Sequence, residues 1–236
     1  MDPLLISAAS GMKARMESLD MLANNIANSG TTGFKADREF YSVYQEELPV
    51  IESQWTDFSQ GTVIPTGNPL NVALSGKGFF ALNGPNGTVY TRNGNFQISK
   101  TNQLAASEGY TLRNVLDRGR PLTVDPEQAI TIDKIGVVAQ NGQQIGQIEI
   151  GEIPSAANAL GKLGNSYFSL VDKTNSAAPS QATEVLQGQL EQSNVPVAES
   201  AVRLISVMRQ FEMLQKAMTL SSQMSKDAIQ EVAKAS

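Results

Sequence analysis

Apolar residues recur every seven positions at both ends of the chain, while the long stretch between the ends follows another pattern. Near the N-terminus four residues carry the repeat: Leu5, Met12, Leu19 and Ile26. Near the C-terminus it is carried by Val197, Leu204, Phe211 and Met218. A sevenfold apolar repeat is typical of helices that pack along a shared seam, so the pattern predicts two coiled-coil-like terminal helices.

Local start and stop signals set the expected bounds of these helices. Pro3 suits the first position of a helix, and Gly30 provides a stop signal, so we expect a helix over about residues 3–28. Pro196 opens the second helix, which we expect to continue to about residue 234. At 1.5 Å per residue it would span roughly 55–60 Å, and so long a helix is poorly stable alone. The ends are therefore expected to be weakly ordered in a monomer.

Periodicity alone leaves two interpretations of the terminal helices. They could pair within one chain on a globular core, or they could form a seam between subunits. Beyond Met218 the apolar stripe becomes thin, which favours the second interpretation because a thin stripe buries little area against a single partner. All eight methionines lie in residues 1–21 or 208–224, and flexible thioethers suit surfaces with several neighbours. Ordinary core filling would also explain them.

The middle of the chain consists of short apolar runs separated by turn residues, and fifteen of the 19 glycines lie between residues 61 and 164. The runs predict strands over these ranges: 71–74, 79–82, 88–92, 96–98, 122–124, 130–132, 136–139, 144–150 and 167–170. Asn86-Gly87 marks a turn, and Asn93-Gly94 and Asn141-Gly142 predict two-residue hairpins. The expected fold is therefore α+β: a mostly antiparallel β domain over 62–185, flanked by helical parts over 1–61 and 186–236.

Composition narrows the chemistry that the chain can perform. Eighteen Lys+Arg against 23 Asp+Glu, without a basic block, give little support for a nucleic-acid surface. The absence of cysteine excludes disulfides and thiolate metal sites, and the absence of histidine removes the commonest general base and metal ligand. This leaves only carboxylate, lysine, serine, threonine or tyrosine chemistry to consider, and we single out no catalytic, cofactor-binding or metal-binding residues. No apolar run approaches a membrane span, and the N-terminus lacks the pattern of a secretory signal.

Three weaker features have alternative explanations. Ser75-Gly76-Lys77-Gly78 lacks the full spacing of a phosphate loop and leads into a strand, so we interpret it as a turn. Trp55 is the lone tryptophan, and we expect it to anchor its segment on the core, with an interface role as the alternative. Four carboxylates could in principle support glycan cleavage, but no spacing singles out a pair, and turn residues explain them better. They are Asp57, Asp117, Asp125 and Glu127.

Three blocks of sequence resemble the flagellar rod and hook family. The first is LLISAASGMKARMESLDMLANNIANSGTTGFK at 4–35, with its ANNIAN run and T-GFK ending. The second is TGNPLNVALSGKGFFAL at 66–82, continued by YTRNGNF at 90–96, and the third is SNVPVAESAVRLISVMRQFEMLQKAM at 193–218. The middle stretch from 121 to 170 resembles the proximal-rod branch of the family more than the distal-rod branch. The short middle excludes a full hook protein.

The resemblance implies a structural subunit and not an enzyme. Copies would stack helically with one another and with adjacent rod proteins into the flagellar rod, a drive shaft that crosses the periplasm and passes torque to the hook. The terminal helices would form the inner tube and the β domain the outside. Delivery to the basal body would use the flagellar type III export apparatus, without a cleavable signal and without membrane insertion. A cell-wall glycan hydrolase is the alternative from another class.

The resemblance also assigns roles to individual positions. The assembly interface would consist of Leu5, Met12, Leu19, Ile26, Leu204, Phe211, Leu214 and Met218. The junction motif, where the N-terminal helix ends, would consist of Asn24, Asn25, Asn28, Gly33 and Phe34. The sequence does not give the helical register of the assembly or the number of copies.

Overall fold

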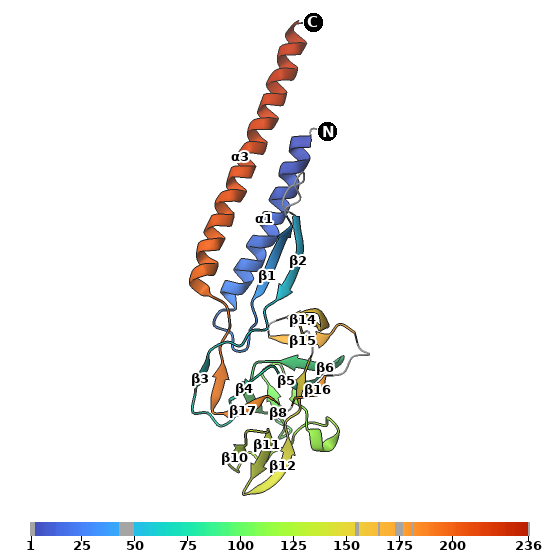
Figure 1. Cartoon of the computed structure of the whole chain (residues 1–236), viewed down its shortest axis with the longest axis vertical. Helices are drawn as coiled ribbons and strands as arrows, with labels where there is room; N and C mark the ends of the chain where they lie inside the picture. Colours follow the sequence, from blue (N-terminus) through green and yellow to red (C-terminus); the bar gives the residue numbers. More distant parts are fainter. Residues whose placement is uncertain are drawn as a thin grey trace. The chain divides into compact units, whose positions relative to one another are not determined.

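The chain folds into two compact units (Figure 1), as a computed structural model shows for residues 3–42, 50–153, 156–164, 166–172, 177–180 and 182–235. The first unit comprises Met1–Ala27, Asp37–Thr56 and Pro196–Ser236. The second comprises Asn28–Ala36 and Asp57–Val195. The backbone therefore passes from one unit to the other four times, after residues 27, 36, 56 and 195.

The first unit contains both predicted terminal helices. Helix α1 spans Pro3–Ala27 and helix α3 spans Val197–Ala235, so each predicted end lies within about two residues of the observed one. The helices run antiparallel, with the start of α1 and the end of α3 pointing the same way (Figure 1). With 25 residues against 39, the N-terminal helix is the shorter of the two.

A two-stranded antiparallel ribbon completes the first unit. It pairs β1 (Asp37–Ser42) with β2 (Val50–Thr56) and contains an irregularity between Phe40 and Tyr41. Residues 43–49 lie outside the described part of the chain. Trp55 lies on β2 and is 41% exposed, so the expectation that it anchors its segment on the core is wrong.

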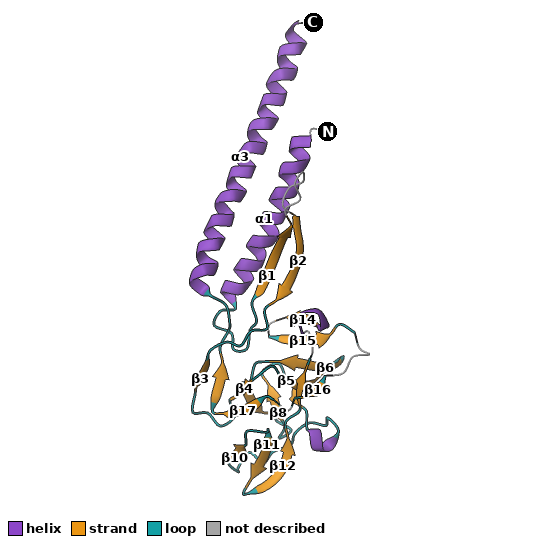
Figure 2. Ribbon diagram, in the orientation of Figure 1, coloured by secondary structure: helices purple, strands orange, loops and turns teal. Residues whose placement is uncertain are grey.

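The second unit is built from strands, as Figure 2 shows by colour. Its strands are β3 (Val63–Pro65), β4 (Val72–Ser75), β5 (Phe79–Gly84), β6 (Gly87–Thr91), β7 (Phe96–Ile98), β8 (Leu104–Ala106), β9 (Thr111–Leu112), β10 (Ile130–Ile132), β11 (Val137–Gln140), β12 (Gln143–Gln147), β13 (Ile150–Glu152), β14 (Leu160–Gly164), β15 (Tyr167–Leu170), β16 (Ala178–Pro179), β17 (Glu184–Gln187) and β18 (Gln189–Glu191). A 3-10 helix, Val115–Asp117, and a short helix α2, Ala156–Ala159, interrupt them. All pairings between the described strands are antiparallel, which confirms the predicted mostly antiparallel β domain.

The largest sheet follows the order β14-β15-β6-β5-β9-β8-β7. In addition, β13 pairs with β5, and β16 pairs with β13. Strand β5 has both faces buried. Phe80 and Leu82 point into the main core cluster, while Phe79 and Ala81 point into a second cluster with Phe168. A strand covered on both sides is apolar without alternation, which is why Phe79 to Leu82 is one continuous apolar run.

Two of the three Asn-Gly predictions are confirmed. Asn141-Gly142 forms the two-residue hairpin between β11 and β12, with positive φ at both positions as a type I′ turn requires. Asn86 lies in the turn between β5 and β6, and Gly87 opens β6. The predicted hairpin at Asn93-Gly94 is wrong, because β6 pairs with β5 and β15 while β7 pairs with β8.

Gly94 serves a different purpose from a turn. Its carbonyl accepts a hydrogen bond from the amide of Val72 at 2.9 Å, and a Cβ at this position would lie 1.5 Å from the Val72 carbonyl oxygen. Only glycine permits this approach of two backbones. Glycine is the residue expected both in a tight hairpin and at a close approach of two backbones, so the sequence could not distinguish these two roles for Gly94.

Two predicted strands also differ from the observed ones. The run 122–124 is not a ladder strand: Thr123 makes one isolated bridge and Pro121, just before the run, makes another, although Leu122 is fully buried in the core. The run 144–150 is divided between β12 and β13. In both places the apolar side chains fill the core as expected, but the backbone pairs only in short pieces.

Candidate assembly surface and buried ion cluster

Helices α1 and α3 pack through a small apolar core within the first unit. Its buried members are Met21, Leu22 and Val207, with Leu19 and Leu204 packed against them. Nearer the start of α1, a Cβ on Gly11 would lie 3.6 Å from the side chain of Leu214, so that leucine packs over Gly11. The intramolecular interpretation therefore explains part of the sevenfold repeat, because the two helices of one chain pack together.

The buried face of α1 is displaced by one residue from the predicted seam. Gly11, Ala14, Ser18, Met21 and Asn25 are buried at spacings of three and four, whereas the predicted Met12, Leu19 and Ile26 are half-buried beside them. The side chain of Leu5 lies outside the described part of the structure. The displacement was hidden in the sequence because the buried positions carry small or polar residues, which allow close helix packing but do not read as an apolar seam.

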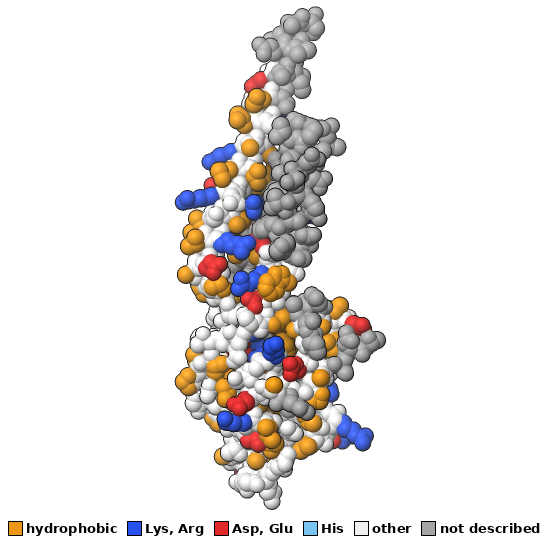
Figure 3. All heavy atoms as spheres, viewed as in Figure 1, with side chains coloured by type: hydrophobic (Ala, Val, Ile, Leu, Met, Phe, Trp, Pro, Cys, Tyr) orange, Lys and Arg blue, Asp and Glu red, His pale blue; other side chains and the backbone are white. Residues whose placement is uncertain are grey.

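Helix α3 has apolar residues on two faces. The predicted Leu204, Phe211, Leu214 and Met218 are half-buried on the face that includes the contacts with α1, whereas the repeat residue Val197 is 47% exposed. Six large apolar side chains are exposed elsewhere on the same helix, and we call them the outer stripe: Val202, Ile205, Met208, Met213, Leu220 and Met224. Figure 3 shows hydrophobic side chains distributed over the part of α3 whose side chains are described.

A shallow groove of about 420 Å³ lies along part of the outer stripe. It is lined by Val202, Ile205 and Met213, with Ser206, Arg209 and Gln210 beside them. Exposed apolar side chains in a continuous row, bordered by polar ones, are typical of a protein interaction surface.

The side chain of Glu39 links three elements of the first unit and was missed by the sequence analysis. It is fully buried on β1 and accepts hydrogen bonds from Ser18 of α1 at 2.5 Å and from Arg203 of α3 at 2.7 Å. Asn25 pairs with β1 in both directions, since its amide donates to the Asp37 carbonyl at 2.8 Å and its oxygen accepts from the Asp37 amide at 2.9 Å. The predicted junction residue Asn25 thus fixes the end of α1 to the ribbon.

The other predicted junction residues are distributed between helix end and β unit. Asn24 is exposed on α1, and Asn28 accepts a hydrogen bond from the Thr31 amide in the turn that follows the helix. Gly33 has a φ of +66° and lies against the backbone of Asn93, where a Cβ would not fit. Phe34 is buried beside Ala36 and Val195, with the Lys162 ammonium 4.2 Å from its ring centre.

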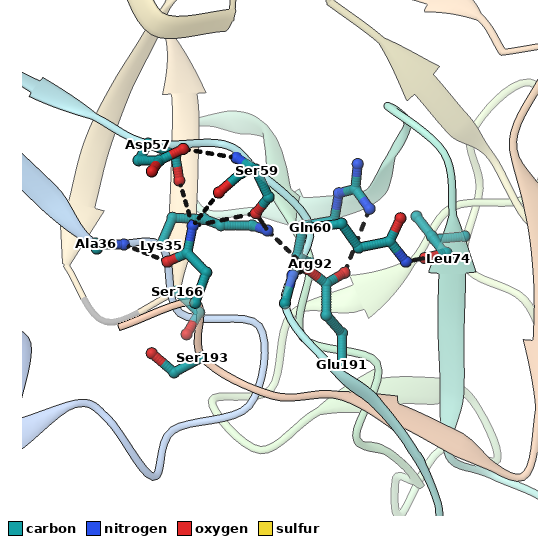
Figure 4. A network of polar contacts seen from close by, with 12 residues as sticks. Lys35, Ala36, Asp57, Ser59, Gln60, Leu74, Arg92, Ser166, Glu191 and Ser193 are labelled. Atoms are coloured by element: carbon teal, nitrogen blue, oxygen red, sulfur yellow. Dashed lines mark hydrogen bonds and ion pairs between the residues drawn. The ribbon is translucent and has the colours of Figure 1, made fainter. Parts of the chain in front are cut away.

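A buried ion cluster in the second unit was also missed. Glu191 on β18 accepts a hydrogen bond from Lys35 at 2.6 Å and pairs with Arg92 at 3.3 Å, and all three side chains are at most 2% exposed (Figure 4). Burial lowers the pKa of Lys35, against the opposing pull of Glu191, and it lowers the pKa of Arg92 too. Two cations share the Glu191 carboxylate, and the Asp57 carboxylate also acts on Lys35.

No sequence signal could have found this cluster. Its three members are 57 and 99 positions apart along the chain, and each one alone reads as an ordinary surface charge. Only the pairing of β18 with β3 and the path of the segment before β1 bring them together.

The described residues provide little support for an enzyme site. Asp57 and Asp125 accept hydrogen bonds from the backbone amides two positions ahead, at 2.9 and 3.0 Å, which is the behaviour of turn residues. No group of three potential metal ligands occurs among the residues that the structure describes. None of the helices in that part of the chain is both long and apolar enough to cross a bilayer.

Comparisons with known proteins give the family. The family model of the flagella basal body rod protein matches residues 5–35, that of the flagellar hook protein FlgE/F/G D1 domain matches 73–150, and that of the flagellar basal body rod FlgEFG protein C-terminal matches 186–231. The chain is 30% identical to the flagellar basal-body rod protein FlgF of Caulobacter vibrioides, with 99% of each chain covered. It is 31% identical to FlgG of Borreliella burgdorferi, covering 93% of this chain and 95% of the relative.

A second FlgF, from Mesorhizobium japonicum, is 31% identical with 97% of each chain covered. The chain therefore belongs to the flagellar basal-body rod protein family. Its relatives are structural rod proteins and not enzymes, so the hydrolase interpretation is not pursued.

Proposed function

We propose that this chain is a structural rod subunit that assembles with its own copies and with adjacent rod proteins through the outer stripe of α3. The single observation that carries the proposal is the row of exposed apolar side chains along α3, which α1 leaves uncovered. Burying such a row against a neighbour contributes about 25 cal/mol for each Å² of apolar surface. Contacts of this heterologous kind, repeated without closing a ring, generate a helical filament.

The family supplies the rest of the proposed arrangement. The parts at 1–61 and 186–236 would form the tube wall of the rod and 62–185 its outer surface, with delivery to the basal body by the type III export apparatus. The predicted interface residues Leu5, Met12, Leu19, Ile26, Leu204, Phe211, Leu214 and Met218 are proposed to contribute once neighbouring helices pack around the pair. The junction motif Asn24, Asn25, Asn28, Gly33 and Phe34 is proposed to fix the exit of α1.

A double change in the outer stripe tests the assembly proposal. Val202→Asp with Met213→Asp should leave the monomer folded, because both side chains are exposed, but should abolish motility when it replaces the native gene in the source bacterium. A matched control places the same charges at the exposed polar positions Gln215 and Ser222 of the same helix. Unimpaired rods and motility in the stripe variant would refute the proposal.

The position within the rod is a finer proposal. We favour the proximal rod, because the middle stretch from 121 to 170 resembles that branch and FlgF proteins are among the full-length relatives. FlgG proteins match at similar identity, so cross-linking in isolated basal bodies is the appropriate test. Cross-links to the hook-proximal end of the rod would contradict a proximal position.

A further inference from the structure

Three segments of the second unit lead directly to the points where the chain passes to the first unit. They are residues 28–36, residues 57–61 and residues 191–195. The contacts described next all lie within the second unit.

The side chain of Asn194 connects all three segments. Its oxygen accepts from the Ala36 amide at 2.8 Å, and its amide donates to the Asp57 carbonyl at 2.7 Å and to the Ser59 carbonyl at 3.1 Å. The backbones of the first two segments also bond directly, from the Asp57 amide to the Ala36 carbonyl at 2.8 Å. Asn194 therefore connects three segments that are remote from one another in sequence.

The ion cluster makes the same connection a second time. Lys35 donates to the Ser59 carbonyl at 2.5 Å as well as to Glu191, and Glu191 accepts from the Gly61 amide at 2.9 Å (Figure 4). The backbone carbonyl of Glu191 accepts from the Gly33 amide at 2.8 Å. One glutamate thus holds all three connecting segments, while Arg92 ties it to the Gly76 carbonyl of the sheet region at 2.5 Å.

Stability alone is a poor explanation for this arrangement. A buried ion cluster recovers little net free energy after its desolvation cost, and apolar residues of similar volume often stabilise as much or more. What directional hydrogen bonds give is a fixed geometry, since each bond weakens steeply when its distance or angle changes. Lys35, Arg92 and Glu191 also lie one in each of the three regions that the family models match.

We propose that Lys35, Glu191 and Asn194 form a clasp that makes the three connecting segments respond to force as one body. Without the clasp, only backbone hydrogen bonds would hold residues 191–195 against force applied at the start of α3, and β18 would peel from β3. With the clasp, the same force is shared with residues 28–36 and 57–61. The inference rests on the proposed function only for the source of the load, which is torque carried by the rod.

Single-molecule pulling on the full-length monomer tests the clasp. The chain has no cysteine, so Gln143→Cys and Glu199→Cys, both at exposed positions, give two defined attachment points. With the clasp intact, we expect no lengthening before the β unit unfolds. With Asn194→Ala, and separately with Lys35→Met, we expect an earlier step at lower force as residues 189–195 peel away. The gain in length is at most about 23–25 Å, the full contour length of seven residues at 3.3–3.6 Å per residue.

The control removes an ion pair of the same unit that holds no connecting segment. Arg113 and Glu149 pair at 3.0 Å and are partly exposed, and Glu149→Gln should show no early step. Asn194→Ala leaves no buried charge unpaired, so the test does not depend on Lys35→Met folding. An early step in the protein with the intact clasp would overturn the proposal. A single unfolding event at the same force in all variants would also overturn it. Failure of the outer-stripe variants to block assembly would instead refute the proposed function and leave this result standing.

Discussion

Glu191 is the residue on which most of the polar organisation of the second unit depends. Its carboxylate accepts from Lys35, Arg92 and the Gly61 amide, while its backbone carbonyl accepts from Gly33. Removing a single partner would leave an uncompensated charge in the interior, which is costly even where the intact cluster adds little stability. The cluster is therefore sensitive to any change in its proton count.

Raising the pH should stabilise the second unit through Lys35. Burial lowers the pKa of Lys35 in the folded protein below its ordinary value of 10.5. Between the lowered pKa of the folded state and the ordinary pKa of the unfolded state, the unfolded chain binds more protons than the folded one. The stability of the second unit therefore rises with pH in this range. The groups facing Lys35 are Glu191, Arg92 and Asp57. The melting temperature of the native protein minus that of Lys35→Met should increase from pH 7 towards pH 10.

The comparison with Lys35→Met removes the contribution of other groups. Tyr90 and Tyr167, whose pKa values burial raises, titrate in both proteins and cancel in the difference. A difference that is constant or that falls with pH would contradict a lowered pKa for Lys35.

Gly94 gives a sharp test of backbone packing. Gly94→Ala should destabilise the second unit by at least about 1–3 kcal/mol, because its Cβ would collide with the Val72 backbone. Gly30→Ala is the matched control, since nothing lies within 4 Å of its Cβ position. Urea unfolding monitored by far-UV circular dichroism would measure the stability of both variants. Equal midpoints for the two variants would disprove the close approach.

At the scale of the elements, α3 is the unusual one. Among the described side chains, one face packs on α1 through a core that includes Met21, Leu22 and Val207, while the outer stripe is exposed. A core of this size contributes about a few kcal/mol. The long helices depend on this contribution to stay ordered, because they are poorly stable alone. We therefore expect the helical pair to exchange its amide hydrogens faster in the monomer than in the rod.

Leu22→Ala should uncouple the two helices. The side chain is 3% exposed, and its loss should cost about 2–5 kcal/mol of local stability and reduce helical circular dichroism in the monomer. Met16→Ala on the same helix is the control, because Met16 is 53% exposed. Helical content that is unchanged in both variants would show that α1 and α3 do not depend on each other. A monomer whose α3 is fully protected from exchange would contradict the expected weak ordering of the helical ends.

At the scale of the whole molecule, the two units have very different cores. The second unit has a large cluster that includes Phe80, Leu82, Leu112 and Leu122, whereas the first depends on the small core between its helices. Because the two cores differ so much in size, we expect the two units to unfold at different temperatures.

Thermal unfolding of the monomer should show two transitions, with the helical signal lost first. Leu82→Ala, at a fully buried site in the second unit, should lower only the later transition, by an amount equivalent to about 2–5 kcal/mol. Differential scanning calorimetry together with circular dichroism would measure both. A single transition that moves as a whole in Leu82→Ala would show that the units unfold as one.

The sequence alone determined the two helices to within about two residues, the antiparallel β middle and the family, because helix caps, apolar runs and long motifs are local signals. It failed where one residue type serves two purposes, as at Gly94, and where a buried helix face is built from Gly11, Ala14 and Ser18. Only the tertiary structure decided which side of α3 stays exposed and that Lys35, Arg92 and Glu191 meet. Such contacts join residues far apart in the chain, and their partners are defined by strand pairing that no local pattern encodes.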